Sequence, residues 1–480
     1  MSKILLVDPP WYIFQNINPP CIPLGLTSIA STLKEKGHEC LIFNGDFTTS
    51  SLQGQERLLC DYQNYQNYLE EMKNKKHIVW NEFKSVLESF NPEYVVLTIL
   101  TPKYVSALEI SRIIKTYNSK IPIIIGGVHP TLLPIETLNE SFFDIAVVGE
   151  GETTVSELIM CLKSSGDITT INGICYKKNG TILQNPPRDL IKNLDTIPLM
   201  DFSLLHRFSE YPKDYFGSIM TSRGCTSRCI FCASHNLWGR KVRFVSPERV
   251  LEEIKNRNYK YGVKKFRFND DTFTANHARI KRICELIVKN KLNITWMCDT
   301  RADRITPEIL EMMKNAGCQQ INIGVESGSE KILEKIQKGE SLKTIKEAFA
   351  LAKKYKIQTL AYFIMGFPFE TREDVEKSIQ LMNEIRPDLI CWSIYTPYPG
   401  TEIYENLLKE GIITKPDWSQ FFHHSINMNF TGFSDQEWLD LVQYVEESNT
   451  KYLLEYNNKK ESSYLTNIPF FRRILGLPKK

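Results

Sequence analysis

The stretch TSRGCTSRCIFC, residues 221–232, places three cysteines, Cys225, Cys229 and Cys232, close together behind a glycine. Their spacing is Cys-x3-Cys-x2-Cys, which is typical of a loop that holds an iron–sulfur cluster through thiolates. Three thiolates supply ligands to only three of the four irons in a cubane cluster. The fourth iron therefore keeps an open position, at which a small molecule can bind as it does at catalytic metal sites.

Two other interpretations of these cysteines are weaker. A structural zinc site needs four ligands, and no second CxxC or HxxxH pair stands at the spacing of a zinc finger. Chance clustering of buried thiols fits poorly with the polar residues between them. Among the remaining cysteines, Cys284, Cys298, Cys318 and Cys391 lie in apolar patterns and are expected to be small buried residues.

Around this motif, short β-rich runs alternate with amphipathic helical patterns. The expected strands are residues 218–221, 265–269, 294–298, 320–325, 359–365 and 389–394. Six β/α units predict a partial, TIM-like (β/α)6 barrel over residues 211–405, with its chemistry at the carboxyl ends of the strands. A mainly helical C-terminal region, residues 406–480, follows.

The first 165 residues show the same α/β alternation. They predict a doubly wound, Rossmann-like parallel sheet, which binds ligands beyond the carboxyl ends of its strands. Residues 166–210 are expected to form a hairpin, with its turn at residues 178–180, and then a linker containing several prolines. The polar stretch 53–80 is expected to be a helical insertion or a mobile cover.

Composition excludes several classes of protein. The 480 residues carry a net charge of only +3, so nothing indicates nucleic-acid binding. No run approaches the roughly 18 apolar residues of a membrane-spanning helix. The apolar run before Asp8 is too short for a signal peptide, which predicts a cytoplasmic protein. The apolar and basic residues 470–477 could contact a membrane surface, although packing onto the barrel is the simpler interpretation.

The cysteine motif, with the aromatic Phe231 before its last cysteine, resembles the radical S-adenosylmethionine (SAM) superfamily, and the domain order resembles its cobalamin (B12)-binding branch. The resemblance implies that Cys225, Cys229 and Cys232 hold a [4Fe–4S] cluster and that SAM chelates the open iron. Reductive cleavage of SAM would then give methionine and a 5′-deoxyadenosyl radical that abstracts hydrogen from the substrate.

The resemblance also assigns SAM contacts at the ends of later barrel strands. The implied SAM-binding residues are Phe231, Asp270, Asp271, Arg301, Glu326, Ser327 and Gly366. Acidic side chains such as Asp270 suit the ammonium group of SAM. Asp271 could equally cap the next helix, and Ser327 could cap a helix entry. The segment 396–401 completes the match.

The first domain resembles the cobalamin-binding domain of this branch. The implied cobalamin-binding residues are Pro10, Leu24, Gly25, Thr98, Gly126, Gly127, His129, Gly149 and Glu150. Small residues at strand ends allow a flat macrocycle to approach closely. The Asp-x-His-x-x-Gly motif that supplies a lower histidine ligand in many cobalamin proteins is absent. His129 could approach the corrin or could be purely structural.

Within this branch the resemblance implies methylation of an unactivated carbon, as in class B radical SAM methyltransferases. The alternative is radical cyclisation or oxidative rearrangement of the anaerobic Mg-protoporphyrin ester cyclase type. A methylthiotransferase would need a second cluster, for which only Cys21, Cys40 and Cys60 are available. A cobalamin carrier with an inactive barrel conflicts with the intact cysteine motif. The expected partners are a small-molecule, lipid or pigment substrate and a reductant such as flavodoxin or ferredoxin.

Overall fold

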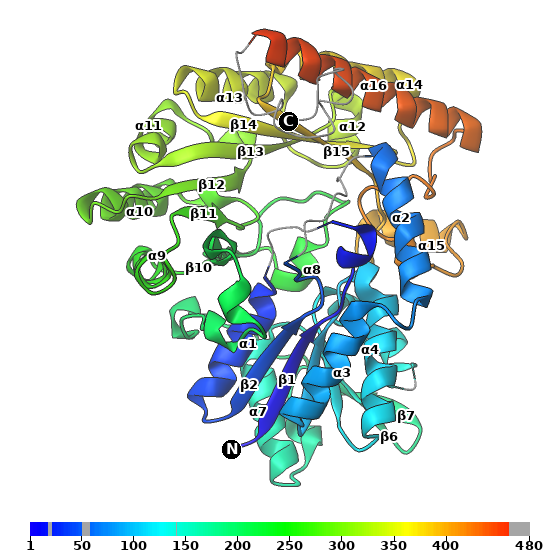
Figure 1. Ribbon diagram of the computed structural model, residues 1–480. Coiled ribbons are helices and arrows are strands. Elements are labelled where there is room, and N and C mark those ends of the chain that lie inside the picture. Colours follow the sequence, from blue (N-terminus) through cyan, green and yellow to red (C-terminus); the bar gives the residue numbers. More distant parts are fainter. Residues whose placement is uncertain (18–21, 50–57, 141, 460–480) are drawn as a thin grey trace.

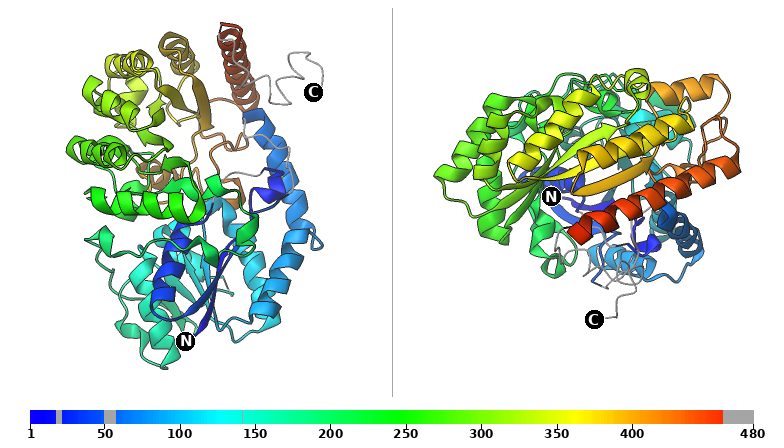
Figure 2. Two further views of the ribbon diagram at one scale, coloured as in Figure 1. Left: turned by 60° about the vertical axis from the view of Figure 1, so that its left-hand side comes forward. Right: turned by 90° about the horizontal axis from the view of Figure 1, so that it is seen from above.

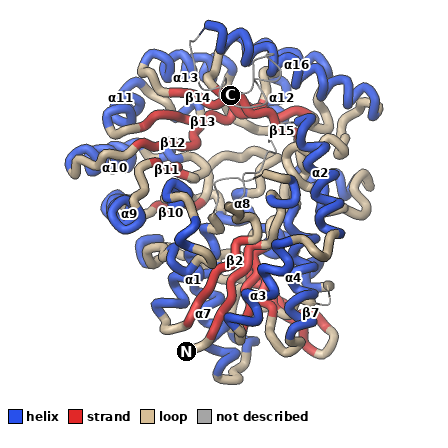
Figure 3. Tube along the Cα trace, in the orientation of Figure 1, coloured by secondary structure: helices blue, strands red, loops and turns tan. Residues whose placement is uncertain are grey.

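The computed structural model describes residues 1–17, 22–49, 58–140 and 142–459. It contains two large sheets, a mixed one and a fully parallel one, in the two halves of the molecule, with loops and the short helix α8 (Ser234–Trp238) between them (Figure 3). The first sheet forms the lower half in Figure 1, and the second forms the upper half.

The N-terminal sheet has the order β2-β1-β3-β4-β5-β6-β7. Its strands are β1 (Lys3–Asp8), β2 (Glu39–Asn44), β3 (Tyr94–Thr98), β4 (Ile123–Gly126), β5 (Ile145–Val147), β6 (Ile174–Lys178) and β7 (Thr181–Gln184). The first five are parallel, and their residues are almost all buried, as is usual for strands covered on both faces. The order reverses between β1 and β3, and such switch points are where doubly wound sheets bind ligands.

Helices cover both faces of this sheet (Figure 1). They are α1 (Leu24–Glu35), α3 (Ile78–Phe90), α4 (Tyr104–Tyr117), α5 (Val128–Leu132), α6 (Pro134–Leu138) and α7 (Gly151–Lys163). The predicted hairpin is present as the antiparallel pair β6 and β7. Its two turn residues, Asn179 and Gly180, both have positive φ, which a two-residue turn between twisted strands requires.

The second sheet is fully parallel, with the order β15-β14-β13-β12-β11-β8. Its strands are β8 (Ser218–Ile219), β11 (Lys265–Phe268), β12 (Thr295–Thr300), β13 (Cys318–Glu326), β14 (Gln358–Met365) and β15 (Leu389–Ile394). Because β8 and β15 do not pair with each other, the barrel is open, as the predicted partial (β/α)6 barrel requires. A short ribbon, β9 (Ser222–Arg223) with β10 (Arg243–Phe244), flanks the cysteine loop.

Amphipathic helices cover the outside of this barrel (Figure 2). They are α9 (Pro247–Tyr261), α10 (His277–Lys289), α11 (Pro307–Asn315), α12 (Glu330–Lys335), α13 (Leu342–Lys354) and α14 (Arg372–Ile385). The C-terminal region adds α15 (Glu402–Lys409) and α16 (Asp435–Lys459), and α16 packs along α14. Among the described residues, no helix is long and apolar enough to cross a bilayer. The predicted membrane contact at residues 470–477 lies outside the described residues.

The stretch predicted to be an insertion contains α2 (Leu58–Lys73), which connects the two halves of the molecule. Tyr65 of α2 shares a 2.8 Å hydrogen bond with Ser419 of the C-terminal region. Tyr68 packs against Trp11 of the first domain, with ring centroids 4.3 Å apart. This helix is therefore part of the interface between the domains.

Candidate active site

The cysteine loop begins immediately after β9. Gly224 has a φ of +103°, and a Cβ there would stand 2.9 Å from the carbonyl oxygen of Lys241, so the turn requires glycine. Burial raises the pKa of the Cys232 thiol to about 12, and the neighbouring Cys229 and Cys225 add to this rise. The three cysteines thus lie near one another on one loop, while within the described residues no three His, Cys, Asp or Glu side chains are grouped closely enough to form a ready-made metal site. An iron–sulfur cluster fits this donor set, since cluster binding takes thiolates and lowers their pKa.

Asp270 does not hold the position predicted for it. Its carboxylate is buried and accepts hydrogen bonds from the Thr221 N–H (2.5 Å), the Thr221 hydroxyl (2.6 Å) and the Ser222 N–H (3.0 Å). These donors belong to the strand that leads into the cysteine loop. The predicted contact of Asp270 with the SAM amino group is therefore replaced by a structural role, because its oxygens are already occupied. Asp271 is exposed and contacts only the Ser234 hydroxyl.

The next strand ends bring charged residues to Cys229. Arg301 follows β12, and Glu326 ends β13 with a positive φ of 63°. The Glu326 carboxylate accepts a 2.8 Å bond from the buried Lys338, which also lies 3.3 Å from Glu340. Lys338 and Arg301 both act electrostatically on the Cys229 thiol. Lys338 was not among the predicted site residues, because the polar segment around it carries no recognisable motif. The turn after α12 brings it to the site.

Ser327 and Gly366 lie at the ends of neighbouring strands. The Ser327 hydroxyl is fully buried, where it contacts Ser378 and accepts from the Ser329 N–H (3.1 Å), so it holds the turn after β13 and is not open to a ligand. This corrects its predicted contact with SAM. Gly366 has a φ of +90°, and a Cβ there would stand 2.7 Å from Trp438. Phe231 packs edge-on against Phe367, which joins the cysteine loop to this segment.

A cavity of about 610 Å³ lies at the switch point of the N-terminal sheet. Seven of the nine predicted cobalamin-binding residues line it: Leu24, Gly25, Thr98, Gly126, Gly127, Gly149 and Glu150. A Cβ at Gly127 would stand 2.8 Å from the Thr98 hydroxyl, whereas one at Gly149 would meet nothing within 4 Å. Small residues thus leave open space above the strand ends, as a flat macrocycle needs.

Pro10 and His129 are not part of this cavity's lining. His129 is fully buried between Tyr104 and Trp418, and its Nδ1 lies 3.4 Å from the Thr101 hydroxyl. Burial lowers its pKa to about 4. Of the two roles left open for His129, its position favours the structural one over contact with the corrin, because the C-terminal region packs over it.

Residues that the sequence analysis assigned to a linker form one wall of this cavity. Leu194, Ile197, Pro198 and Met200 line it. The opposite side is formed by barrel residues 219–223, which lead into the cysteine loop. The cavity is therefore shared between the two domains, and a ligand in it touches the strand that positions the cysteines.

Comparisons with known proteins agree with this geometry. The radical SAM superfamily matches residues 219–382, and the B12-binding domain family matches residues 11–159. An uncharacterized methyltransferase of Pyrococcus horikoshii is 34% identical over 91% of this chain and 90% of its own length. The anaerobic magnesium-protoporphyrin IX monomethyl ester cyclase of Rubrivivax gelatinosus is 27% identical over 68% of this chain and 60% of its own length.

A solved structure shows the same architecture. OxsB, a cobalamin-dependent SAM radical enzyme with aqua-cobalamin and SAM bound, matches 99% of this chain and 76% of its own length, with a TM-score of 0.70 and 18% identity. The chain belongs to the cobalamin-dependent radical SAM superfamily. Its cofactors are a [4Fe–4S] cluster, SAM and cobalamin.

In this radical SAM protein, a buried ion cluster joins the cobalamin-binding domain to the barrel. Arg223 donates to Glu150 and Glu152, both at 2.6 Å, and Arg243 donates to Glu150 at 2.8 Å. The Ser28 hydroxyl also donates to Glu152. Although burial alone would raise it, the pKa of Glu152 is held low by Arg223. Arg223 precedes the cysteine loop in the sequence and Arg243 follows it. This ion cluster therefore fixes both ends of the loop to the cavity wall.

A second buried ion group lies at the ends of β1 to β3. Lys103 stands 2.8 Å from both Asp8 and Asp46, and all three side chains are less than one-tenth exposed. Asp46 also accepts a hydrogen bond from the Trp11 N–H. Asp8 and Lys103 line the cavity, so this group shapes the cavity floor. A lone lysine at the start of a helix gave no sequence signal for this role.

The cysteines of the methylthiotransferase alternative gain no support. Cys40 lies in β2, and burial raises the pKa of its thiol to about 12. The side chains of Cys21 and Cys60 lie outside the described residues. The described structure therefore shows one cysteine loop with an architecture suited to a cluster.

Proposed function

We propose that this enzyme methylates an unactivated carbon of a small molecule. The observation that carries the proposal is the shared cavity, whose walls come from the cobalamin-binding strand ends and from residues 219–223 before the cysteines. The match to a methyltransferase over nearly the full length of both chains supports it. When bound, the cluster supplies the electron that cleaves SAM, and cobalamin supplies the methyl group.

Within this proposal, Cys225, Cys229 and Cys232 hold the cluster. Lys338 and Arg301 are cations that act electrostatically on Cys229, and Glu326 pairs with Lys338 at 2.8 Å. Cations suit the carboxylate of SAM, and Glu326 or Asp271 suits its ammonium group. The backbone at Gly366 is the proposed SAM contact of this strand end, and its positive φ and the packed Trp438 leave no room for a side chain there.

The barrel interior provides the polar groups that we propose orient the substrate. Along β11, Phe266 and Phe268 are buried toward the helices, so Arg267 between them faces the interior. Arg267 lies 3.5 Å from Asp299 of β12, which accepts a 2.6 Å bond from the Asn322 amide. The Arg267 side chain remains nearly half exposed. Such a polar interior favours a substrate with hydroxyl, amide or carboxyl groups over a lipid or pigment.

The products from SAM test the proposal. Methylation consumes two SAM molecules, so S-adenosylhomocysteine and 5′-deoxyadenosine should form together, and deuterium from methyl-labelled SAM should enter the product. Cyclisation, the second candidate suggested by the partial match to the ester cyclase, would give 5′-deoxyadenosine without S-adenosylhomocysteine. The enzyme should first be purified anaerobically with cobalamin. An absorption spectrum without corrin bands would contradict the assigned cavity.

A further inference from the structure

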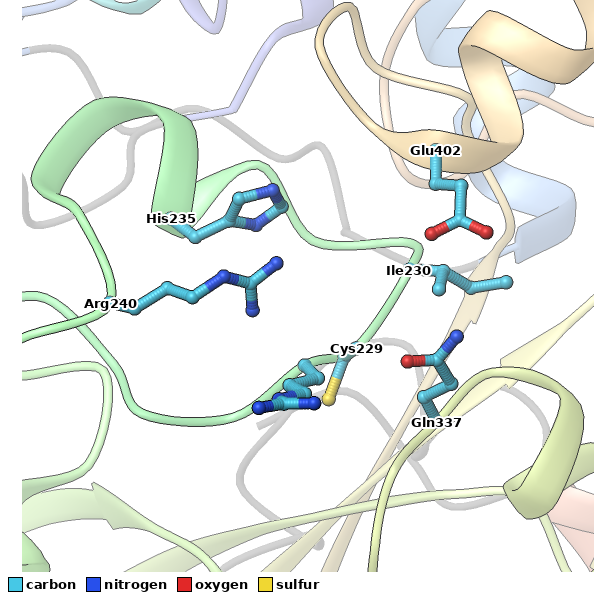
Figure 4. Close-up of a pocket in the computed structure, with 7 residues that line it drawn as sticks. Cys229, Ile230, His235, Arg240, Gln337 and Glu402 are labelled. Carbon is cyan, nitrogen blue, oxygen red and sulfur yellow. The ribbon is translucent and has the colours of Figure 1, made fainter.

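The segment around the cysteines borders two cavities that have no lining residue in common. One is the cavity of about 610 Å³ proposed for cobalamin. The other has a volume of about 340 Å³ and borders the middle of the cysteine loop at Cys229 (Figure 4). Figure 4 shows His235 and Arg240 on one side of this smaller cavity and Gln337 and Glu402 on the other. Because the middle of the loop borders open space, its position depends on how its two ends are held.

Both ends of the loop belong to the wall of the larger cavity. Residues 219–223 precede the cysteines, Trp238 follows them, and all of these residues line it. The Arg223 guanidinium lies 5.3 Å from the centroid of the Trp238 ring, so the two ends of the loop meet at this wall. The same guanidinium is paired with Glu150 and Glu152, which also line the cavity. A ligand in the cavity therefore meets both ends of the loop and the carboxylates that hold them.

The linker fastens the segment that follows the loop. Arg243 donates to the Ile191 carbonyl oxygen at 2.7 Å, and Arg249 donates to the Ile197 carbonyl oxygen, also at 2.7 Å. Arg249 and Ile197 line the larger cavity as well. The residues that hold the chain on either side of the cysteines are thus in large part the residues that a cavity ligand would touch.

Trp238 brings an unused hydrogen-bond donor to this wall. Its ring is partly buried, and within the part of the chain that the structure describes its indole N–H makes no hydrogen bond. A partly buried indole N–H usually finds an acceptor. The corrin ring of cobalamin carries amide side chains around its edge, and their carbonyl oxygens accept hydrogen bonds. Trp238 therefore suits the edge of a corrin.

We propose that Arg223 and Trp238 are the barrel's part of the cobalamin site and that they couple cobalamin binding to cluster binding. The inference rests on the proposed function, which places cobalamin in the larger cavity. Since the cysteines do not form a ready-made metal site within the described residues, cluster binding has to order the loop. A ligand that already holds both ends of the loop reduces the entropy lost in this step. Linkage then requires the cluster to strengthen cobalamin binding by the same factor, typically about 5- to 150-fold.

The test measures hydroxocobalamin binding to the full-length protein under anaerobic conditions. Equilibrium dialysis with absorbance detection gives the dissociation constant with the cluster reconstituted and again after iron has been removed by a chelator. In the wild type the value should be about tenfold lower with the cluster than without it. In Trp238→Leu, which keeps the ion pairs of Arg223, the two values should differ by less than about twofold. The matched control Tyr259→Leu removes an exposed aromatic ring of α9 and should keep the tenfold difference.

A role of Trp238 in contact or folding alone predicts a different result. Trp238→Leu would then weaken binding equally with and without the cluster, and this outcome would refute the coupling. The wild type provides a second test if Trp238→Leu does not fold: saturating hydroxocobalamin should slow iron loss to excess EDTA by about tenfold, whereas equal rates would overturn the inference. A wild type that binds no hydroxocobalamin in either state would instead contradict the cavity assignment of the proposed function, and the inference with it.

Discussion

Replacing Arg223 with methionine tests the ion cluster between the two domains. Methionine keeps much of the volume of the side chain but removes the guanidinium that donates to Glu150 and Glu152. These carboxylates are 3% and 8% exposed, so water cannot replace the lost partner. Breaking a buried ion pair by removing one partner costs about 3–5 kcal/mol. Since Arg243 still pairs with Glu150, we expect a loss near the lower value, about 3 kcal/mol.

The measurement is denaturant unfolding of the apoprotein, followed by circular dichroism. The control Arg282→Met removes a surface pair with Glu248, in which both side chains are about half exposed, and should cost less than about 1 kcal/mol. Adding Glu152→Leu to Arg223→Met should recover part of the loss, because it removes the unpaired buried carboxylate. If Arg223→Met is no more destabilising than the control, the ion cluster does not hold the domains together.

Three further outcomes are expected. Cys229→Ala should abolish iron binding and SAM cleavage in a folded chain, whereas Cys284→Ala, at a buried position of helix α10, should keep both; iron retained by Cys229→Ala would refute the ligand assignment. The pKa of His129 is lowered to about 4, so between pH 6.5 and 4 the unfolded chain takes up a proton that the folded chain does not. Stability should therefore fall by about 3 kcal/mol as the pH decreases through this window, and His129→Leu should flatten the dependence without changing corrin content. Asp270→Asn should reduce cluster retention more than SAM affinity, because its oxygens accept from Thr221 and Ser222; an unchanged iron content with weakened SAM binding would restore the role first predicted from the sequence.

Local patterns predicted most of the fold. The six barrel strands lie where the β-rich runs indicated, with ends displaced by at most two residues. This agreement follows from buried parallel strands, whose apolar runs are bounded by polar turns. The hairpin turn at Asn179 was also predictable, because positive φ at both turn positions favours the residues found there.

Other features depended on contacts between distant segments. β1 lies between β2 and β3 in the sheet, and this order determines where the cavity forms. The hydrophobic periodicity of a single segment does not predict which strands become neighbours. The contact of Ile197 and Met200 with that cavity could not be predicted from the sequence, because the linker has no hydrophobic periodicity that would show which side chains face inward.

The sequence by itself determined the cluster motif, the two α/β domains and the glycines at the cavity. Each of these rests on neighbouring residues, whose spacing and conformational freedom can be read directly from the chain. The tertiary structure alone decided that Asp270 supports the loop, that His129 is covered by Trp418, and that Arg223 pairs with Glu150. In these cases the partners are 49 to 289 residues apart, and only the folded chain brings a charged or polar group to the one that satisfies it.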